Sequence, residues 1–202
     1  MADRGRPRSF DRAAALRRAM ELFWERGYEA TTLEDIKAAM GGIGSPSFYA
    51  AFGSKEALFL EAVELYRASD GSTTSRALAD QPTARAAVEA VLREAVASFT
   101  RGGVPAGCLV VLGAMNGSPA SKRVQEHLKE LRLQTPTVIE KRLERGITDG
   151  DLRTGIDTAA VAAFYTTVLH GLTIQARDGA SRDTLSAVVD GAMAAWKVLT
   201  RP

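Results

Sequence analysis

The chain has 202 residues, 46% of them hydrophobic, which is enough for one ordinary domain or two small ones with real cores. The formal net charge of +2 is too small to indicate a nucleic-acid binder by itself. The single cysteine excludes an internal disulfide, and no apolar run has the length of a membrane span or the pattern of a signal peptide. These features predict a soluble, cytoplasmic protein without a membrane partner.

Positive charge is concentrated at the N-terminus, where residues 1–18 hold six arginines against two aspartates. Within the polar arm of residues 1–9, the run Arg-Gly-Arg-Pro that begins at Arg4 resembles the centre of an AT-hook, a segment that lies in the DNA minor groove. Narrow A·T-rich grooves attract arginine through their negative potential. We therefore predict that Arg4, Arg6 and Arg8 contact DNA. The alternative is a solubilising tail.

A first helix is predicted over about residues 11–26, and Gly27 closes it. Its apolar side chains fall on one face at helical spacing, which indicates a core and not a binding surface. The members of this face are Ala13, Leu16, Met20, Phe23 and Trp24.

A second, short helix follows, with Thr32 as its N-cap and Asp35 three residues later, the spacing of a capping box. Gly41 and Gly42 end it, because glycine tolerates the left-handed backbone found at helix C-termini. Ser45 is predicted to cap a third helix.

The third helix is expected to start with Pro46 at its first helical position and to run to Phe52. Phe48 and Phe52 are four residues apart and are expected to face inward. The small residues Ser45, Ser47, Ala50 and Ala51 are then expected to face outward. Gly53 stops this helix, and Ser54 caps the next one, which extends to about Tyr66.

Two short helices joined by a glycine turn form the layout of a helix-turn-helix, whose second helix enters the DNA major groove. With GYEATTLEDI before the turn and SFYAAFGSKEALF after it, residues 8–66 resemble the DNA-binding domain of the TetR family of transcriptional repressors. The turn GGIG is about one residue longer than the commonest family form. The resemblance implies an all-α fold with a DNA-binding domain at 1–66 and a ligand-binding and dimerisation domain at 67–202.

The resemblance also implies which residues contact a double-stranded, palindromic operator. Tyr49 and Lys55 match phosphate-gripping positions, as does the helix N-terminus capped at Thr32, where free N–H groups attract anions. The alternatives are core packing for Tyr49 and a plain cap for Thr32. The third helix contributes Ser45, Pro46 and Ser47. Because its outer surface lacks Arg, Lys, Asn and Gln, we expect much of the specificity to come from DNA shape and the arginine arm.

The remainder is predicted to be helical, because no segment alternates with a two-residue period. The domain boundary is placed in the polar stretch 69–82. Helices are expected over residues 83–101, over the short apolar run 108–115, and over residues 121–145, where Pro136 should kink or split the helix. A turn at 144–152, a helix capped by Asp157 with Val161, Phe164, Tyr165, Val168 and Leu172 on one face, and a helix at 181–199 complete the chain.

The last two helices have apolar faces edged with Ala and Gly, and family likeness implies that they pair with a second subunit as a four-helix bundle. Burial inside one monomer is the alternative. A small, mostly apolar effector is expected in the C-terminal domain and would release the operator. Candidate lining residues are Phe99, Cys108, Leu112, Met115, Phe164 and Tyr165, which would serve equally well as ordinary core.

Signals for other functions are weak. His127 and His170 have no Cys or acid at ligand spacing, so no metal site is expected, and no nucleotide loop, paired acids or triad indicates an enzyme or a cofactor. His127 is expected to be solvated, and His170 is a candidate for the dimer seam. Three alternatives stay open: a small helical ligand-binding protein, a non-specific DNA binder that uses its arm, and an oxidant or electrophile sensor acting through Cys108.

Overall fold

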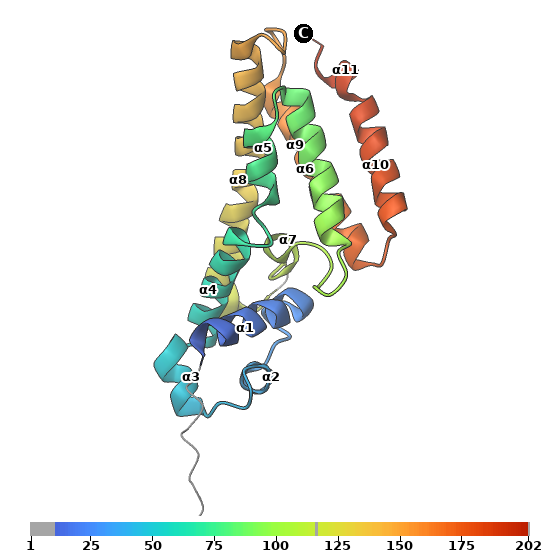
Figure 1. Cartoon of the computed structure of the whole chain (residues 1–202). Helices are drawn as coiled ribbons and strands as arrows, with labels where there is room; N and C mark the ends of the chain where they lie inside the picture. Colours follow the sequence, from blue (N-terminus) through green and yellow to red (C-terminus); the bar gives the residue numbers. More distant parts are fainter. Residues whose placement is uncertain (1–10, 116, 202) are drawn as a thin grey trace, which may run out of the picture.

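In a computed structural model of the chain, which describes residues 11–115 and 117–201, helices form two groups stacked end to end (Figure 1). The described residues contain helices and no strand, which agrees with the predicted all-α class. The N-terminal group, here called the head, comprises α1 (Arg12–Arg26), α2 (Leu33–Ala39), α3 (Ser45–Phe52) and α4 (Lys55–Ala68).

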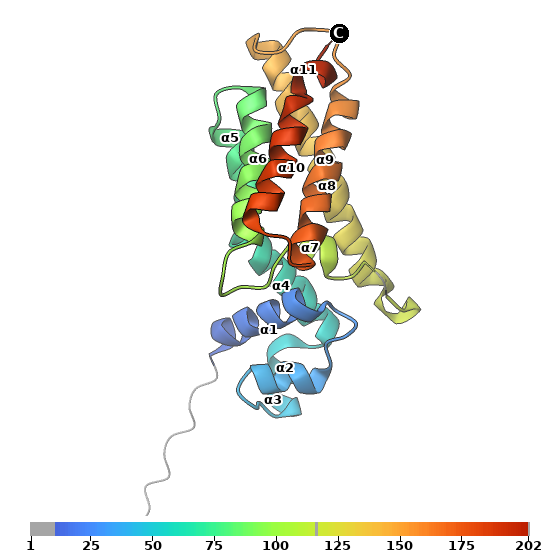
Figure 2. The same ribbon diagram turned by 90° about the vertical axis from the view of Figure 1, so that its right-hand side faces the viewer.

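The second group, here called the body, begins with α5 (Thr73–Asp80) and α6 (Ala84–Phe99). The short helices α7 (Leu109–Leu112) and η1 (Pro119–Ser121) follow. The long α8 (Lys122–Asp149) and α9 (Thr158–Arg177) pack against α6, and α10 (Arg182–Ala194) and α11 (Trp196–Leu199) close the chain. Figure 2 shows α9 and α10 side by side.

Two apolar cores hold these groups. One, centred on α6, α9 and α10, lies within the body. The other lies in the head, where Phe23 of α1 meets Phe59 of α4 edge to face at 4.9 Å, and the inward-facing Phe48 and Phe52 of α3 belong to the same core. Of the predicted α1 face, Ala13 alone is exposed. The head core continues into the body through Leu109 of α7 and several residues of α8, so apolar contact crosses between the groups.

Most predicted caps are confirmed, because each cap side chain accepts a hydrogen bond from a backbone N–H three residues later. Thr32 and Asp35 form the complete capping box of α2, and Ser54 and Asp157 cap α4 and α9. The prediction for α3 is wrong by one residue: Gly44 is the N-cap and Ser45 the first helical residue. The Ser45 Oγ instead accepts a hydrogen bond from Lys37 Nζ at 3.2 Å.

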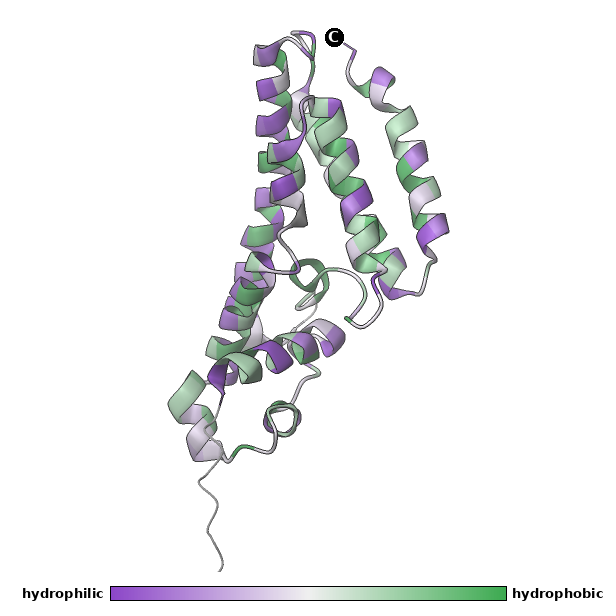
Figure 3. Cartoon of the chain, in the orientation of Figure 1, coloured by the Kyte–Doolittle hydropathy of each residue, from purple (hydrophilic) through white to green (hydrophobic). Residues whose placement is uncertain are grey.

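Three segments of the body differ from the prediction. The stretch 69–82 contains α5, whose Ala77 and Leu78 are buried against the body core. Pro136 does not split α8, which continues as one helix on either side of it. The predicted turn at 144–152 starts later, because α8 extends to Asp149 and ends at Gly150 with φ +84°. Hydrophilic and hydrophobic residues alternate along α8 in Figure 3, as expected for a helix with one solvated side.

One helix, α9, is long and apolar enough to cross a membrane by length and composition alone. It also packs against α6, α8 and α10, and 44% of its most apolar window is buried inside the protein. A core helix of a globular protein has these same properties, so α9 carries no argument for a membrane.

Candidate DNA interface and internal cavity

The turn between α2 and α3 is built on two glycines with positive φ, Gly41 at +90° and Gly42 at +79°. The N–H of Gly42 donates to the carbonyl of Lys37 at 2.9 Å and so closes the end of α2. The chain then re-enters a helix at Ser45. This confirms the predicted helix-turn-helix and its use of glycine at the helix end.

The outer surface of α3 presents small and aromatic groups. Pro46, Ser47 and Ala50 are exposed, and Tyr49 is 51% exposed with its ring edge-on to Phe48. Tyr49 is therefore not a core residue. Ala51, in contrast, is half-buried against the head core, contrary to the predicted outward position.

The residues predicted to contact phosphates take part in local interactions of the head. The hydroxyl of Thr32 donates to Asp35 at 2.6 Å, inside the capping box of α2. Lys55 lies with its Nζ 4.3 Å from the centre of the Tyr28 ring, and burial lowers its pKa while Glu29 opposes that effect. Lys37, half-buried between α2 and α3, is a cation near this surface that the sequence reasoning missed. Arg4, Arg6 and Arg8 lie outside the described residues.

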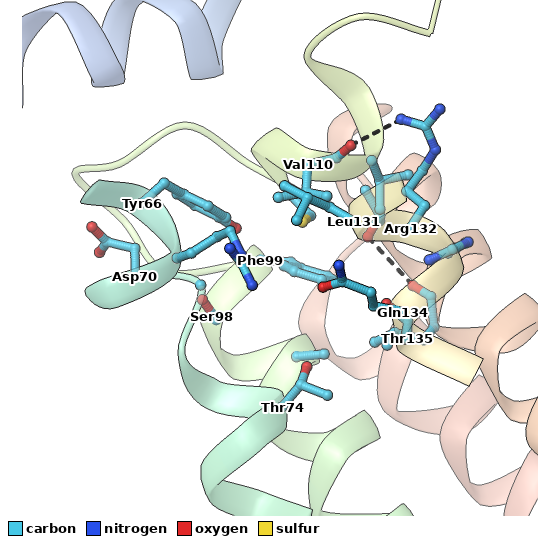
Figure 4. A pocket seen from close by; sticks show the side chains of 18 of the residues that line it. Tyr66, Asp70, Thr74, Ser98, Phe99, Val110, Leu131, Arg132, Gln134 and Thr135 are labelled. Atoms are coloured by element: carbon cyan, nitrogen blue, oxygen red, sulfur yellow. Dashed lines mark hydrogen bonds between the residues drawn. The ribbon is translucent and has the colours of Figure 1, made fainter. Parts of the chain in front are cut away.

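A cavity of about 180 Å³ lies where α4 of the head meets α5, α6, α7, α8 and α9 of the body (Figure 4). Its wall combines apolar side chains with hydroxyls, an amide, a thiol and charged groups. The lining residues are Tyr66, Arg67, Asp70, Gly71, Thr74, Ala95, Ser98, Phe99, Cys108, Val110, Val111, Leu131, Arg132, Gln134, Thr135, Val138, Leu169, His170 and Thr173.

Of the predicted lining residues, Phe99 and Cys108 belong to this wall, and the other four do not. Tyr165 is fully buried in the body core, where its hydroxyl donates to the carbonyl of Ala192 at 3.2 Å. Its neighbour Phe164 points outward because successive residues of a helix lie about 100° apart. Leu112 is half-buried outside the wall, and Met115 is exposed.

The wall also contains groups that the sequence reasoning set aside. His170, a candidate for the dimer seam, lines the cavity, and burial together with the charge of Arg132 lowers its pKa. Burial raises the pKa of the Cys108 thiol, although a hydrogen bond with Tyr66 opposes this. Within residues 11–115 and 117–201, no group of three or more His, Cys, Asp or Glu side chains could hold a metal ion.

Side chains of the cavity wall reach directly into the head. Asp70, two residues beyond α4, forms an ion pair with Arg17 of α1 at 2.9 Å and another with Arg101, which follows α6. Close by, the indole Nε1 of Trp24 donates to the carbonyl of Gly107 at 3.0 Å. The head and the cavity wall are thus joined by hydrogen bonds as well as by packing.

A sequence model described as "Bacterial regulatory proteins, tetR family" matches residues 15–62, and one described as "Tetracyclin repressor-like, C-terminal domain" matches residues 82–192. The chain is 31% identical to the HTH-type transcriptional repressor ComR of Escherichia coli K12 over 199 residues, covering 98% of this chain and 94% of ComR. It is 31% identical to the repressor BdcR of the same organism over 196 residues, or 96% of this chain and 93% of BdcR.

Among solved structures, a cysteine mutant of the TetR family regulator CifR superposes with a TM-score of 0.91 and 48% identity, covering 95% of this chain and 100% of that one. That structure holds CifR with a 26-base-pair double-strand operator DNA. Both the helix-turn-helix head and the helical body match TetR family models, and the relatives cover nearly the whole chain. The chain therefore belongs to the TetR family of DNA-binding transcriptional regulators.

Proposed function

We propose that this regulator is a homodimeric repressor whose two heads bind the half-sites of a palindromic operator and leave it when a small molecule fills the cavity. The observation that carries the proposal is that one residue, Asp70, both lines the cavity and bonds Arg17 of the head. A ligand can alter DNA affinity only if it prefers one of two states, and a shared residue gives it a route to do so.

The DNA surface of each head is the exposed side of α3 with its neighbours. Ser45, Pro46, Ser47 and Tyr49 would face the major groove and its phosphates, with Thr32 and Lys55 at the flanks. The arm residues Arg4, Arg6 and Arg8 would add minor-groove contacts. Because small side chains dominate α3, specificity would rest on close approach and on DNA shape.

The second subunit would pair with α9 and α10. Three large apolar side chains on these helices are exposed: Phe164 and Ile174 on α9, and Val188 on α10. Gly171 and Gly191 face open space, so another helix could approach closely there. On this basis residues 1–66 form the DNA-binding unit, and residues 67–202 form the unit for effector binding and dimerisation.

The test is selection of bound duplexes from a random pool, followed by gel shifts of the winning sequence at several salt concentrations. We expect a palindrome and a steep loss of affinity with salt, because phosphate contacts release counterions. A candidate effector should then reduce binding to this sequence. A monomer that selects no sequence would refute the proposal, and so would a dimer whose affinity no cavity ligand changes.

An electrophile sensor is the second candidate, because the thiol of Cys108 lines the cavity. The raised pKa of Cys108 works against it, since the thiolate is the reactive form. If an electrophile releases the operator from the native protein and not from Cys108→Ser, sensing through Cys108 is established. Equal release from the two proteins would remove this candidate.

A further inference from the structure

Arg132 is a cation in the cavity wall that no carboxylate of residues 11–115 or 117–201 neutralises. Its side chain leaves α8 and its Nη1 donates to the carbonyl of Val110 in α7 at 3.1 Å (Figure 4). Within the part of the chain that the structure describes, no acidic side chain forms an ion pair with it. A guanidinium has five N–H donors, so most of its hydrogen-bonding capacity has no partner among these residues.

The other charged groups of the wall are already paired. Asp70 receives Arg17 and Arg101, and Arg67 donates to Glu64 at 3.1 Å. The one uncompensated charge among the described residues of the wall is therefore positive. Burial lowers the pKa of Arg132, which means that its charge is partly removed from water and would gain from an anion.

His170 of α9 lies beside this charge. Burial and the positive charge of Arg132 both lower the pKa of His170, so near neutral pH it is an uncharged group that can donate one hydrogen bond and accept another. Cys108 and Tyr66, which are hydrogen-bonded to each other, also line the cavity, and burial raises the pKa of both, so the thiol and the phenol stay protonated. The charge of Arg132 is thus flanked by neutral groups and by apolar wall.

We propose that the effector is a small amphipathic anion, a carboxylate that binds the guanidinium of Arg132 and carries an apolar body of one ring or a short chain. The body would pack against Phe99, Leu131 and Leu169. The volume of about 180 Å³ suits this size. An engineered apolar cavity of about 150 Å³ accepts benzene.

The biological meaning of this inference rests on the proposed function, but binding can be measured on the protein alone, without DNA. The probes are matched pairs of nearly equal shape, benzoate with benzamide and hexanoate with hexanamide, titrated by calorimetry at neutral pH. We expect each acid to bind about tenfold or more tightly than its amide, because hydrogen bonds to a charged group are stronger than neutral ones.

Three variants test whether the preference for the acid over the amide comes from Arg132. Arg132→Gln should remove it, Arg132→Lys should retain part of it through the remaining charge, and Arg145→Gln is the control. Arg145 lies on the same helix, outside the cavity wall, and pairs with Asp149. Thermal unfolding of each variant shows whether the fold is intact.

The inference is overturned if the amides bind as well as the acids, if neither member of a pair binds, or if the acid preference survives in folded Arg132→Gln. Any of these results leaves operator binding and release by a neutral ligand untouched. Conversely, acids that bind through Arg132 without changing operator affinity would support the inference and refute release as the function of the cavity.

Discussion

At the scale of single residues, two side chains hold the last turn of α1 against the body. The indole of Trp24 donates to the carbonyl of Gly107, and the guanidinium of Arg177 from α9 donates to the carbonyl of Trp24 at 3.2 Å. Trp24 is 1% exposed, so its N–H has no access to bulk water. These bonds connect three segments that are far apart in the sequence.

Replacing Trp24 with Phe should lower the free energy of unfolding by about 1–3 kcal/mol, because the buried carbonyl of Gly107 loses its donor. Urea denaturation followed by circular dichroism measures the change. The matched control is Trp196→Phe, which makes the same change from indole to phenyl at another buried site. There, the indole N–H has no hydrogen-bond acceptor among the described residues. Equal losses in the two variants would show that packing alone explains the effect.

His170 makes a prediction about pH. Its pKa in the folded protein lies below the ordinary value of 6.5, so the unfolded chain binds a proton first as the pH falls. The contribution of His170 to the free energy of unfolding should therefore be constant above about pH 6.5. The free energy of unfolding should decline as the pH drops from there toward the pKa of His170 in the folded protein. Thermal unfolding between pH 7.5 and 5.5 should show this decline in the native protein and a smaller one in His170→Gln.

The other histidine provides the control for this measurement. His127 is half-buried between α8 and α4, contrary to the predicted solvated position, and its Nε2 lies 3.7 Å from Glu64. His127→Gln should keep the decline in stability. If His170→Gln follows the same pH curve as the native protein, then carboxylates and not His170 cause the dependence.

At the scale of elements, the turn of the helix-turn-helix depends on backbone conformation. A Cβ on Gly42 would meet nothing within 4 Å, so the only obstacle to a side chain there is its φ of +79°. Gly42→Ala should therefore cost about 1–2 kcal/mol of stability and weaken operator binding, since the start of α3 must shift. Urea denaturation and gel shifts measure the two effects.

Gly44→Ala is the control in the same turn. Gly44 has an ordinary φ of −70°, and its added Cβ would meet Pro46 at 3.7 Å, an ordinary contact. A stiffer unfolded chain would offset the slightly poorer N-cap, so stability should hardly change. Similar losses for Gly42→Ala and Gly44→Ala would mean that positive φ does not limit this turn.

Local chemistry explains which elements the sequence could predict. Thr32 with Asp35, the glycine turn and Asp157 are short-range signals, and each is confirmed where it was expected. The continuity of α8 is different, because proline in a helix interior argues for a break and α8 is held by packing on α9 and α6. α5 was missed because its residues are mostly small and polar, although α5 is packed against α6 and buries Ala77 and Leu78.

The cavity could be predicted only in part for a related reason. Phe99 is the last residue of α6 and Cys108 precedes α7, and both side chains line the cavity. Their positions next to the turn between these two helices could be read from the sequence. Phe164 and Tyr165 were expected on one face, but they are neighbours in sequence and only Tyr165 is buried. Arg132 and His170 line the cavity because of the way α8 and α9 cross, and the residue pattern of neither helix predicts that crossing.

At the scale of the whole molecule, the two cores do not coincide with the predicted domains. The head core contains Leu109 and Leu128 from the body, and Asp70 joins Arg17 to Arg101 at the same junction. A ligand in the cavity would therefore touch the wall that supports the head. In the proposed release, a small change near Tyr66 would be passed through these contacts to the head and would alter the direction in which α3 faces.

The last prediction concerns the second subunit. Gly191 of α10 is exposed with open space around its Cα, so Gly191→Arg should fold normally as a single chain. In a dimer paired through α9 and α10, the long side chain would hold the helices apart. We expect a monomer by light scattering and operator affinity lower by on the order of a hundredfold, because the two heads no longer bind as one unit.

Ala79→Arg serves as the control, since it adds the same side chain to an exposed position on α5, away from α9 and α10. It should remain dimeric and bind the operator normally. If Gly191→Arg stays dimeric, then the subunits pair through another face, and the exposed Phe164, Ile174 and Val188 need a different partner. If it becomes monomeric yet binds the operator undiminished, one head is sufficient, and the argument from paired half-sites fails.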